Sequence, residues 1–272
     1  MGDFAANLAI SYEIGAARGE YSILSAMGVN EDEFFASFGR TINDLIINHR
    51  GDLEKRRQQS PSMSTFRKFV RPASPTAPKR RWADGTPEYS LHMYALHRLF
   101  PQAQFVHVFR DVQAVVCSMV NFHRVAGIQL VANEEEAYRY WIRTVKGCLM
   151  AEQAFGPTVV YRVRYADMVS NPEPTMRSIL GFLGEPYAVT CLEPLAHRIN
   201  SSEVPADFKP DDRATDPSVI RNAMRLFAEV EEKPQPTERS PAATDELKVA
   251  FRERVRRMAP PSVPLAKAPA DN

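Results

Sequence analysis

The chain of 272 residues has few cysteines and almost no net charge. Its 34 lysines and arginines offset 33 acidic residues, so the formal charge is +1. No overall field is available to hold nucleic acid or an anionic membrane, and a basic site must therefore be local. The three cysteines, Cys117, Cys148 and Cys191, show no C-x-x-C spacing and cannot all pair with one another. We expect reduced thiols and a cytoplasmic protein.

Long hydrophobic runs and several catalytic signatures are also missing. No apolar run approaches the ~20 residues that a membrane helix needs, and the N-terminus lacks the basic and apolar regions of a signal peptide. The six histidines form neither an H-E-x-x-H motif nor a Cys/His cluster, so we expect no metal. Neither a G-x-S-x-G motif nor basic strands interleaved with aromatics occur. We expect no membrane span and no nucleic-acid partner.

The composition is otherwise that of a globular protein, with 44% hydrophobic and 25% charged residues. The pattern along the chain divides it into three parts. Residues 1–81 are predicted to be a helical region with a basic loop, because a capped helix over residues 30–50 precedes a stretch rich in Lys, Arg, Ser and Pro. Residues 82–231 are predicted to be an α/β core, and residues 232–272 a Pro-rich tail that is interrupted by one basic helix candidate near residues 245–258.

The core shows strands alternating with helices, which is typical of a parallel sheet flanked by helices. The expected strands cover residues 81–84, 104–109 and 158–163. The expected helices cover residues 89–99, 112–120, 133–155 and 171–183. Asp111 and Asn133 are the natural N-caps of two of these helices, and Gly156 ends one of them.

One candidate anion site follows from this pattern. Arg110 comes directly after a strand and before a helix, where the free N–H groups of the helix N-terminus bind anions. Its guanidinium can bind two phosphate oxygens at once. Ser118 lies on the same helix but off its apolar stripe, so burial does not explain it, and its hydroxyl can donate to phosphate. An Arg-Asp pair after a strand is also common as a structural ion pair or cap.

Several strings of this region resemble the sulfotransferase family. They are W-A-D-G-T-P at residues 82–87, L-F-P-Q-A-Q-F-V-H-V-F-R-D at 99–111 with Ser118-Met119, and V-R-Y-A-D-M-V-S-N-P at 163–172. The resemblance covers about residues 80–187, and its most specific element is R-D-x6-S after an apolar strand. It implies a P-loop-NTPase-like α/β architecture and the co-substrate 3′-phosphoadenosine 5′-phosphosulfate (PAPS). It also implies that Arg110 and Ser118 hold the 3′-phosphate and that Tyr165 lies near the adenine. Tyr165 is alternatively a tyrosine at the rim of the core.

The sequence departs from the family's pattern at two places. The family begins with a strand and a P-R-S-G-T-like loop for the 5′-phosphosulfate, and none of the 12 glycines here opens a comparable loop. We therefore expect an architecture without its first strand and loop. Gly85 stands where many relatives have a lysine before Thr-Pro. That lysine would help to neutralise the transferring sulfuryl group.

Sulfuryl transfer also needs a base that deprotonates the acceptor. The candidates are Glu88, Asp84 and His92, with Glu88 first, because they flank Thr86-Pro87 or lie one helical turn away. Each also has an ordinary role open to it: Asp84 as a turn acceptor, Glu88 as a carboxylate at a helix start, and His92 as a packed surface histidine.

The expected function is the transfer of a sulfuryl group from PAPS to a hydroxyl or amine of a small molecule or glycan, without a metal. Two alternatives stay open. One is a non-catalytic relative that binds the nucleotide through Arg110, Ser118 and Tyr165, and the other is a relative of nucleotide kinases.

Overall fold

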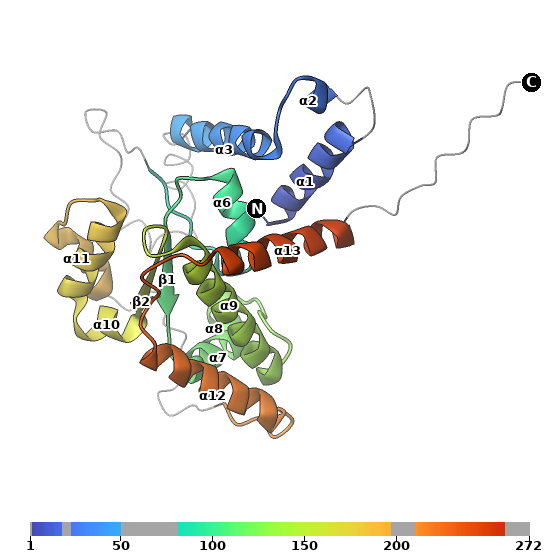
Figure 1. The fold of residues 1–272 in the computed structure, drawn as a ribbon. Helices are drawn as coiled ribbons and strands as arrows, with labels where there is room; N and C mark the ends of the chain where they lie inside the picture. The colour runs from blue at the N-terminus through green and yellow to red at the C-terminus, as the bar shows by residue number, and fades with distance from the viewer. Residues whose placement is uncertain (1, 18–22, 50–80, 197–209, 259–272) are drawn as a thin grey trace, which may run out of the picture.

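The computed structural model describes residues 2–17, 23–49, 81–196 and 210–258. Within these ranges the protein is an α/β structure in which two parallel strands lie among helices (Figure 1). None of the described helices is long and apolar enough to cross a bilayer. The elements are α1 (Gly2–Ala17), α2 (Ile23–Ala26), α3 (Glu31–Asn48), η3 (Pro87–Leu91), α6 (Met93–Leu99), β1 (Phe105–Phe109), α7 (Val112–Val120), α8 (Phe122–Ala126), α9 (Glu134–Phe155), β2 (Val160–Arg164), α10 (Tyr165–Ser170), α11 (Pro172–Leu183), η4 (Val189–Ala196), α12 (Pro217–Glu232) and α13 (Pro241–Met258).

The two strands pair in parallel and in register over their whole length. Phe105 lies opposite Val160, and Phe109 lies opposite Arg164. A parallel pair needs a crossover connection, and here α7, α8 and α9 supply it. The predicted α/β class and both of these strands are confirmed. The ends of the two strands differ from the predicted ones by at most two residues, as is usual for the boundaries of strands.

The strand predicted at residues 81–84 is wrong, because residues 81–86 form no regular structure. A local turn replaces it. The Asp84 carboxylate accepts hydrogen bonds from the backbone N–H and the hydroxyl of Thr86, at 2.9 and 2.6 Å. Such a side-chain turn competes with strand pairing. The helix predicted over residues 89–99 is divided into η3 and α6, with His92 between them.

Capping residues define the helices around the sheet as predicted. Asp111 accepts a hydrogen bond from the N–H of Ala114 at 2.8 Å and starts α7. Asn133 accepts one from Glu136 at 2.9 Å and starts α9, which ends at Gly156 with a φ of 76°. A positive φ is costly for other residues, so glycine is suited to this end. The predicted helix before residue 50 is α3, which begins with a complete capping box between Asn30 and Glu33.

The main hydrophobic core lies between α7, α9 and α12, beside the end of β1. Trp141 of α9 and Phe109 of β1 contact each other there, with ring centroids 6.1 Å apart. Val112 and Val116 of α7 are fully buried against this core, as the apolar stripe predicts. The core therefore fixes the position of the loop between β1 and α7.

A second core joins the N-terminal helices to the end of the described chain. Phe35 of α3, Leu99 of α6 and Phe251 and Val255 of α13 are buried together. In Figure 1, α13 lies alongside α1 and α9. The helix predicted near residues 245–258 is α13, which begins earlier, at Pro241, and packs on the rest of the protein. The buried residues of α13 are few, so its apolar stripe is hard to recognise in a segment rich in charged residues.

Candidate functional site

The site predicted at the end of β1 brings Arg110 and Tyr165 together. Arg110 follows β1 and Tyr165 follows β2, and the last paired residues of the two strands are Phe109 and Arg164. The parallel register therefore places the next residues side by side. The guanidinium of Arg110 lies over the ring of Tyr165, 4.6 Å from its centroid. This is a cation–π contact at the carboxyl edge of the sheet, where ligands bind in open α/β sheets.

The charge of Arg110 is not neutralised by a carboxylate within the described residues. Asp111 comes directly after Arg110, but its carboxylate caps α7. The carbonyl of Arg110 accepts a hydrogen bond from the indole N–H of Trp141 at 3.4 Å. The backbone is held in this way, while the half-buried guanidinium keeps its donors available at the start of a nine-residue helix. A free guanidinium beside a helix N-terminus is suited to an anion.

Ser118 lies two turns along α7 and is half-buried. Its hydroxyl makes no hydrogen bond to the part of the chain that the structure describes. Because the buried stripe of α7 runs through Val112 and Val116, Ser118 is turned away from the centre of the core. Its hydroxyl is therefore outside the centre of the core and open to a ligand.

The three candidate bases lie in different surroundings. Asp84 is exposed, and its second carboxylate oxygen accepts a hydrogen bond from Tyr89 at 3.2 Å. The hydrogen bond from the Thr86 hydroxyl is the main cause that lowers the pKa of Asp84 below its usual value. Asp84 thus acts as a turn acceptor. Its lowered pKa makes it a weaker base.

Glu88 is exposed in the first turn of η3 and makes no hydrogen bond or ion pair within the described residues. It lies near Tyr140 of α9, where its charge contributes to raising the pKa of the Tyr140 hydroxyl, after the larger effect of burial. Trp141, the next residue of α9, donates to the carbonyl of Arg110. Among the three candidate bases, Glu88 is therefore the one whose carboxylate has no partner within the described residues. Neighbouring residues of α9 lie near Glu88 and Arg110.

His92 lies at the contact between η3 and the N-terminal helix α1. An added Cβ at Gly2 of α1 would be 2.5 Å from the His92 ring, so the backbone of α1 packs directly on the imidazole. Burial lowers the pKa of His92 below its usual value, and the nearby charge of Arg254 lowers it further. Arg254 of α13 in turn pairs with Asp3 of α1 at 2.5 Å. His92 thus packs against α1, and the opposing charge of Glu88, which acts to raise its pKa, does not outweigh these effects.

Comparison with known proteins assigns the family. The model of the sulfotransferase family matches residues 36–188, which is more than half of the chain. The chain belongs to the sulfotransferase family. Two relatives are each named omega-hydroxy-beta-dihydromenaquinone-9 sulfotransferase Stf3, from Mycobacterium bovis and Mycobacterium tuberculosis. Each is 27% identical over 105 residues, which cover 36% of this chain and 27% of the relative.

A solved structure, the sulfotransferase domain from the curacin biosynthetic pathway, is also similar. It is 19% identical, covers 62% of this chain and 61% of its own, and superposes with a TM-score of 0.36. The part of the chain that matches the curated relatives spans about a quarter of their length, 27%. The family match includes Arg110, Ser118 and Tyr165, as well as Asp84, Glu88 and His92.

The chain also contains a buried ionic network that sequence reasoning missed. Glu152 of α9 is fully buried, and its carboxylate lies 2.6 Å from Nδ1 of His107 and 2.5 Å from a guanidinium nitrogen of Arg162. Burial alone would raise the pKa of Glu152, but hydrogen bonds from His107 and Arg162 outweigh it and lower the pKa. The signal was present in the sequence, because Glu152 continues the apolar stripe of Trp141 and Val145.

The network joins β2 to the end of α12 and the segment after it. Arg162 also donates to the carbonyls of Val230 and Lys233, at 3.2 and 3.0 Å. Beside this contact, a groove of about 460 Å³ runs along β2 between α11 and residues 233–235. No cluster of metal-ligating side chains occurs among the described residues.

Proposed function

We propose that this chain is a sulfotransferase that binds PAPS at the carboxyl ends of β1 and β2 and transfers its sulfuryl group to a hydroxyl or amine. The observation that carries the proposal is the contact between Arg110 and Tyr165. It provides a cation without a carboxylate partner among the described residues, and it lies at the start of α7. These features fit a nucleotide that carries a phosphate on its ribose.

We assign the 3′-phosphate to Arg110 and Ser118. The guanidinium and the first N–H groups of α7 would bind the phosphate from one side, and the hydroxyl of Ser118 would donate from further along the helix. Tyr165 would contact the adenine with the part of its ring that Arg110 leaves open, since 39% of the residue is exposed. The 3′-phosphate distinguishes this nucleotide from ATP, so this contact supplies specificity as well as affinity.

When bound, PAPS supplies an activated sulfuryl group, whose S–O bond to the 5′-phosphate breaks as the acceptor oxygen or nitrogen bonds to sulfur. The acceptor loses one proton in this step, and adenosine 3′,5′-bisphosphate leaves. We assign Glu88 as the base because its carboxylate has no partner among the described residues. His92 is the second candidate, since its lowered pKa favours the neutral imidazole that can accept a proton. Asp84 is the third.

Binding and turnover can be tested separately with the purified chain. Isothermal titration calorimetry is carried out with adenosine 3′,5′-bisphosphate, AMP and ATP. Transfer is then measured with ³⁵S-labelled PAPS and a panel of alcohols, phenols, amines and glycans. The proposal expects the bisphosphate to bind more tightly than AMP or ATP, and a labelled acceptor to form.

The alternatives give different outcomes in the same experiments. Binding of the bisphosphate without any transfer would identify a non-catalytic nucleotide-binding relative. Tighter binding of ATP than of the bisphosphate would instead identify a relative of nucleotide kinases. Either result would overturn the assignment of a sulfotransferase activity to this chain.

A further inference from the structure

A second groove lies between α9 and α12, away from the site at Arg110. It has a volume of about 370 Å³ and is lined by Arg139, Ile142, Arg143, Lys146, Val219 and Asn222. Trp141 of α9 faces Arg110, whereas Ile142 is turned by about 100° around the helix axis. The groove therefore opens on another face of α9, and the proposed nucleotide site does not include it.

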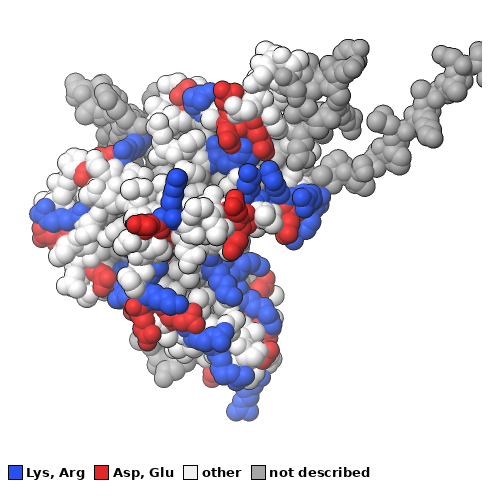
Figure 2. Space-filling model, in the orientation of Figure 1, with Lys and Arg blue, Asp and Glu red and all other residues white. Residues whose placement is uncertain are grey.

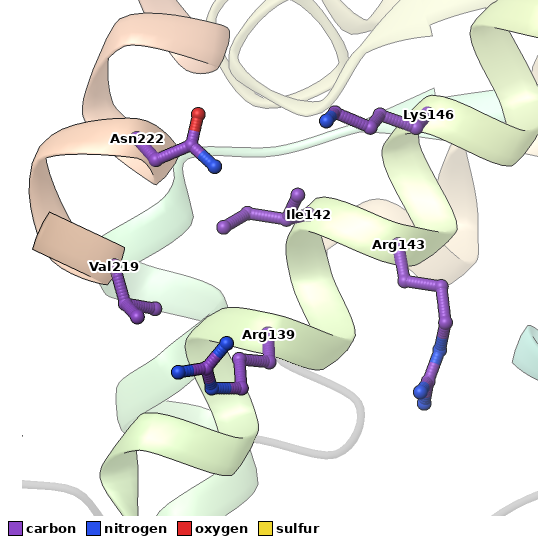
Figure 3. Close-up of a pocket in the computed structure, with 6 residues that line it drawn as sticks. All are labelled: Arg139, Ile142, Arg143, Lys146, Val219 and Asn222. Carbon is purple, nitrogen blue, oxygen red and sulfur yellow. The ribbon is translucent and has the colours of Figure 1, made fainter. Parts of the chain in front are cut away.

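The sides of this groove present hydrogen-bond donors. Figure 3 shows the side chains of Lys146 and Asn222 directed toward each other above Ile142, whereas the guanidinium of Arg139 lies on the other side of Ile142, near Val219, and Arg143 points away from the groove. The side-chain oxygen of Asn222 accepts a hydrogen bond from Arg225 at 3.1 Å. This bond orients the amide and leaves its NH₂ group to donate. The polar groups around the groove thus suit a ligand group that accepts hydrogen bonds. Two of these polar groups are cationic.

The positive charge on this face of α9 is only partly neutralised. Arg139, Arg143 and Lys146 follow one another at helical spacings of four and three residues, where like charges repel. Arg139 pairs with Glu135 at 2.8 Å. Arg143 lies over the Tyr140 ring, 5.5 Å from its centroid, and neither Arg143 nor Lys146 has an ion pair within the described residues. Figure 2 shows basic side chains, with acidic ones among them, over the lower part of the molecule, where α9 and α12 lie in Figure 1.

The floor of the groove is apolar. Val219 of α12 is buried, and Ile142 of α9 packs on the same core. The aliphatic stems of Arg139 and Lys146 extend this surface toward the rim. Pockets for small molecules combine an apolar lining with a few placed polar groups, and their volumes begin at about 300 Å³. The floor therefore fits an apolar body, while the rim fits a negatively charged group.

We propose that the groove between α9 and α12 binds a small organic anion, namely a sulfonate, sulfate ester or carboxylate attached to an apolar ring or chain. The ammonium of Lys146 and the amide of Asn222 contact the anionic group, while Arg139 lines the opposite side of the groove. Ile142 and Val219 contact the apolar part. This proposal does not depend on the proposed sulfotransferase activity, because none of these residues is assigned to that reaction.

Naphthalene-2-sulfonate is the probe for this site, with 2-naphthol as the uncharged analogue and inorganic sulfate as the anion without an apolar body. We expect the sulfonate to bind at least threefold more tightly than either in calorimetry at low salt, and to weaken in 0.5 M NaCl. Equal binding of the sulfonate and 2-naphthol would overturn the proposal. So would equal binding of the sulfonate and inorganic sulfate.

Two variants test the named contacts without changing the fold greatly. Lys146→Met keeps an apolar stem and removes the charge, and Asn222→Asp keeps the shape but replaces the donor with a negative charge. Each is expected to weaken sulfonate binding threefold or more, whereas Lys248→Met on the exposed face of α13 is expected to leave it unchanged. Unchanged binding in both groove variants would overturn the assignment.

Arg110→Ala separates this site from the nucleotide site. The variant is expected to bind naphthalene-2-sulfonate as the original chain does. If Arg110→Ala abolishes sulfonate binding, the probe occupies the site at the start of α7 and the groove proposal is wrong. Failure of adenosine 3′,5′-bisphosphate to bind would affect the proposed function alone.

Discussion

The guanidinium of Arg110 lies 4.6 Å from the centroid of the Tyr165 ring, although the two residues belong to different strand-to-helix connections. The contact follows from the parallel register, which ends with Phe109 opposite Arg164. A shift of either strand by one residue would turn the side chains to the opposite face. The two candidate ligand-binding residues are thus positioned by the sheet itself.

Arg110→Ala is expected to weaken binding of adenosine 3′,5′-bisphosphate at least tenfold. A hydrogen bond to a charged group contributes about 1.5–3 kcal/mol, and about 1.4 kcal/mol corresponds to a factor of ten. Arg110→Lys keeps the charge but cannot bind two phosphate oxygens at once. Its affinity should therefore lie between those of the original chain and Arg110→Ala. Isothermal titration calorimetry measures the affinity of the original chain and of both variants for the bisphosphate. An unchanged affinity in Arg110→Ala would remove Arg110 from the site.

Tyr165→Leu should weaken bisphosphate binding more than Tyr165→Phe does. Phenylalanine keeps a ring beneath the Arg110 guanidinium and beside the adenine, whereas leucine removes both contacts. A cation–π contact at a partly exposed site contributes about 0.5–1 kcal/mol, so the leucine variant should lose about two- to fivefold in affinity. Equal affinities of the two variants would show that the ring contributes nothing to binding.

Glu88→Gln is expected to lower kcat by about 10²–10⁴ if Glu88 is the base, while the affinity for the bisphosphate stays the same. Glutamine keeps the shape of the side chain but cannot take the acceptor proton. Asp84→Asn is the matched comparison, because Asp84 is held in a turn by Thr86 and Tyr89. A larger loss of kcat in Asp84→Asn than in Glu88→Gln would assign the base to Asp84.

Glu152→Gln should destabilise the protein by about 3–5 kcal/mol, because it leaves the charge of Arg162 without its buried partner. Chemical denaturation at pH 7 measures the free energy of unfolding. Glu173→Gln is the control, since it breaks an exposed pair with Arg177 within α11 and should cost well under 1 kcal/mol.

The free energy of unfolding should depend on pH differently in Glu152→Gln and in the original chain. The folded protein holds the pKa of Glu152 below the usual value of 4.5, so the stabilisation is present at neutral pH and is lost as pH falls through the folded pKa. Between about pH 6 and pH 3, stability should therefore fall less steeply in Glu152→Gln than in the original chain. Parallel curves would show that Glu152 does not titrate in this way.

Gly39→Ala and Gly181→Ala are expected to act in opposite directions. A Cβ at Gly39 of α3 would lie 1.6 Å from the carbonyl oxygen of Leu99, so α3 and α6 would have to move apart. Overpacking of this kind typically costs about 1–3 kcal/mol. Gly181 lies on the exposed face of α11 with nothing within 4 Å of an added Cβ, so alanine should stabilise by about 0.5–1 kcal/mol. Thermal unfolding distinguishes the two.

Local sequence signals predicted the elements that carry the candidate nucleotide site. The N-cap residues Asp111 and Asn133 and the terminal Gly156 act within one turn of the chain, so their effects are visible in sequence. The apolar runs and the helices between them predicted β1 and β2 as strands of a parallel sheet, and the structure supplies their pairing. The placement of Arg110 beside Tyr165 needed the register, which the structure supplies.

Contacts between distant parts of the chain were not predictable in the same way. The strand expected at residues 81–84 is replaced by the Asp84 turn, whose hydrogen bonds compete with sheet pairing. The buried face of α13 becomes clear only when α1 and α9 lie beside it. Glu152 and Arg162 are charged residues at core positions, and each depends on the other to be buried.

The side chain of Gln235 bonds to the backbone of β2 at two places. Its amide accepts a hydrogen bond from the backbone N–H of Arg162 at 2.8 Å and donates to the carbonyl of Val160 at 2.5 Å. A single side chain thus occupies two of the hydrogen-bonding positions that an incoming strand would use on β2. These two backbone groups are thus closed to pairing with a strand of another copy, which is one route to aggregation.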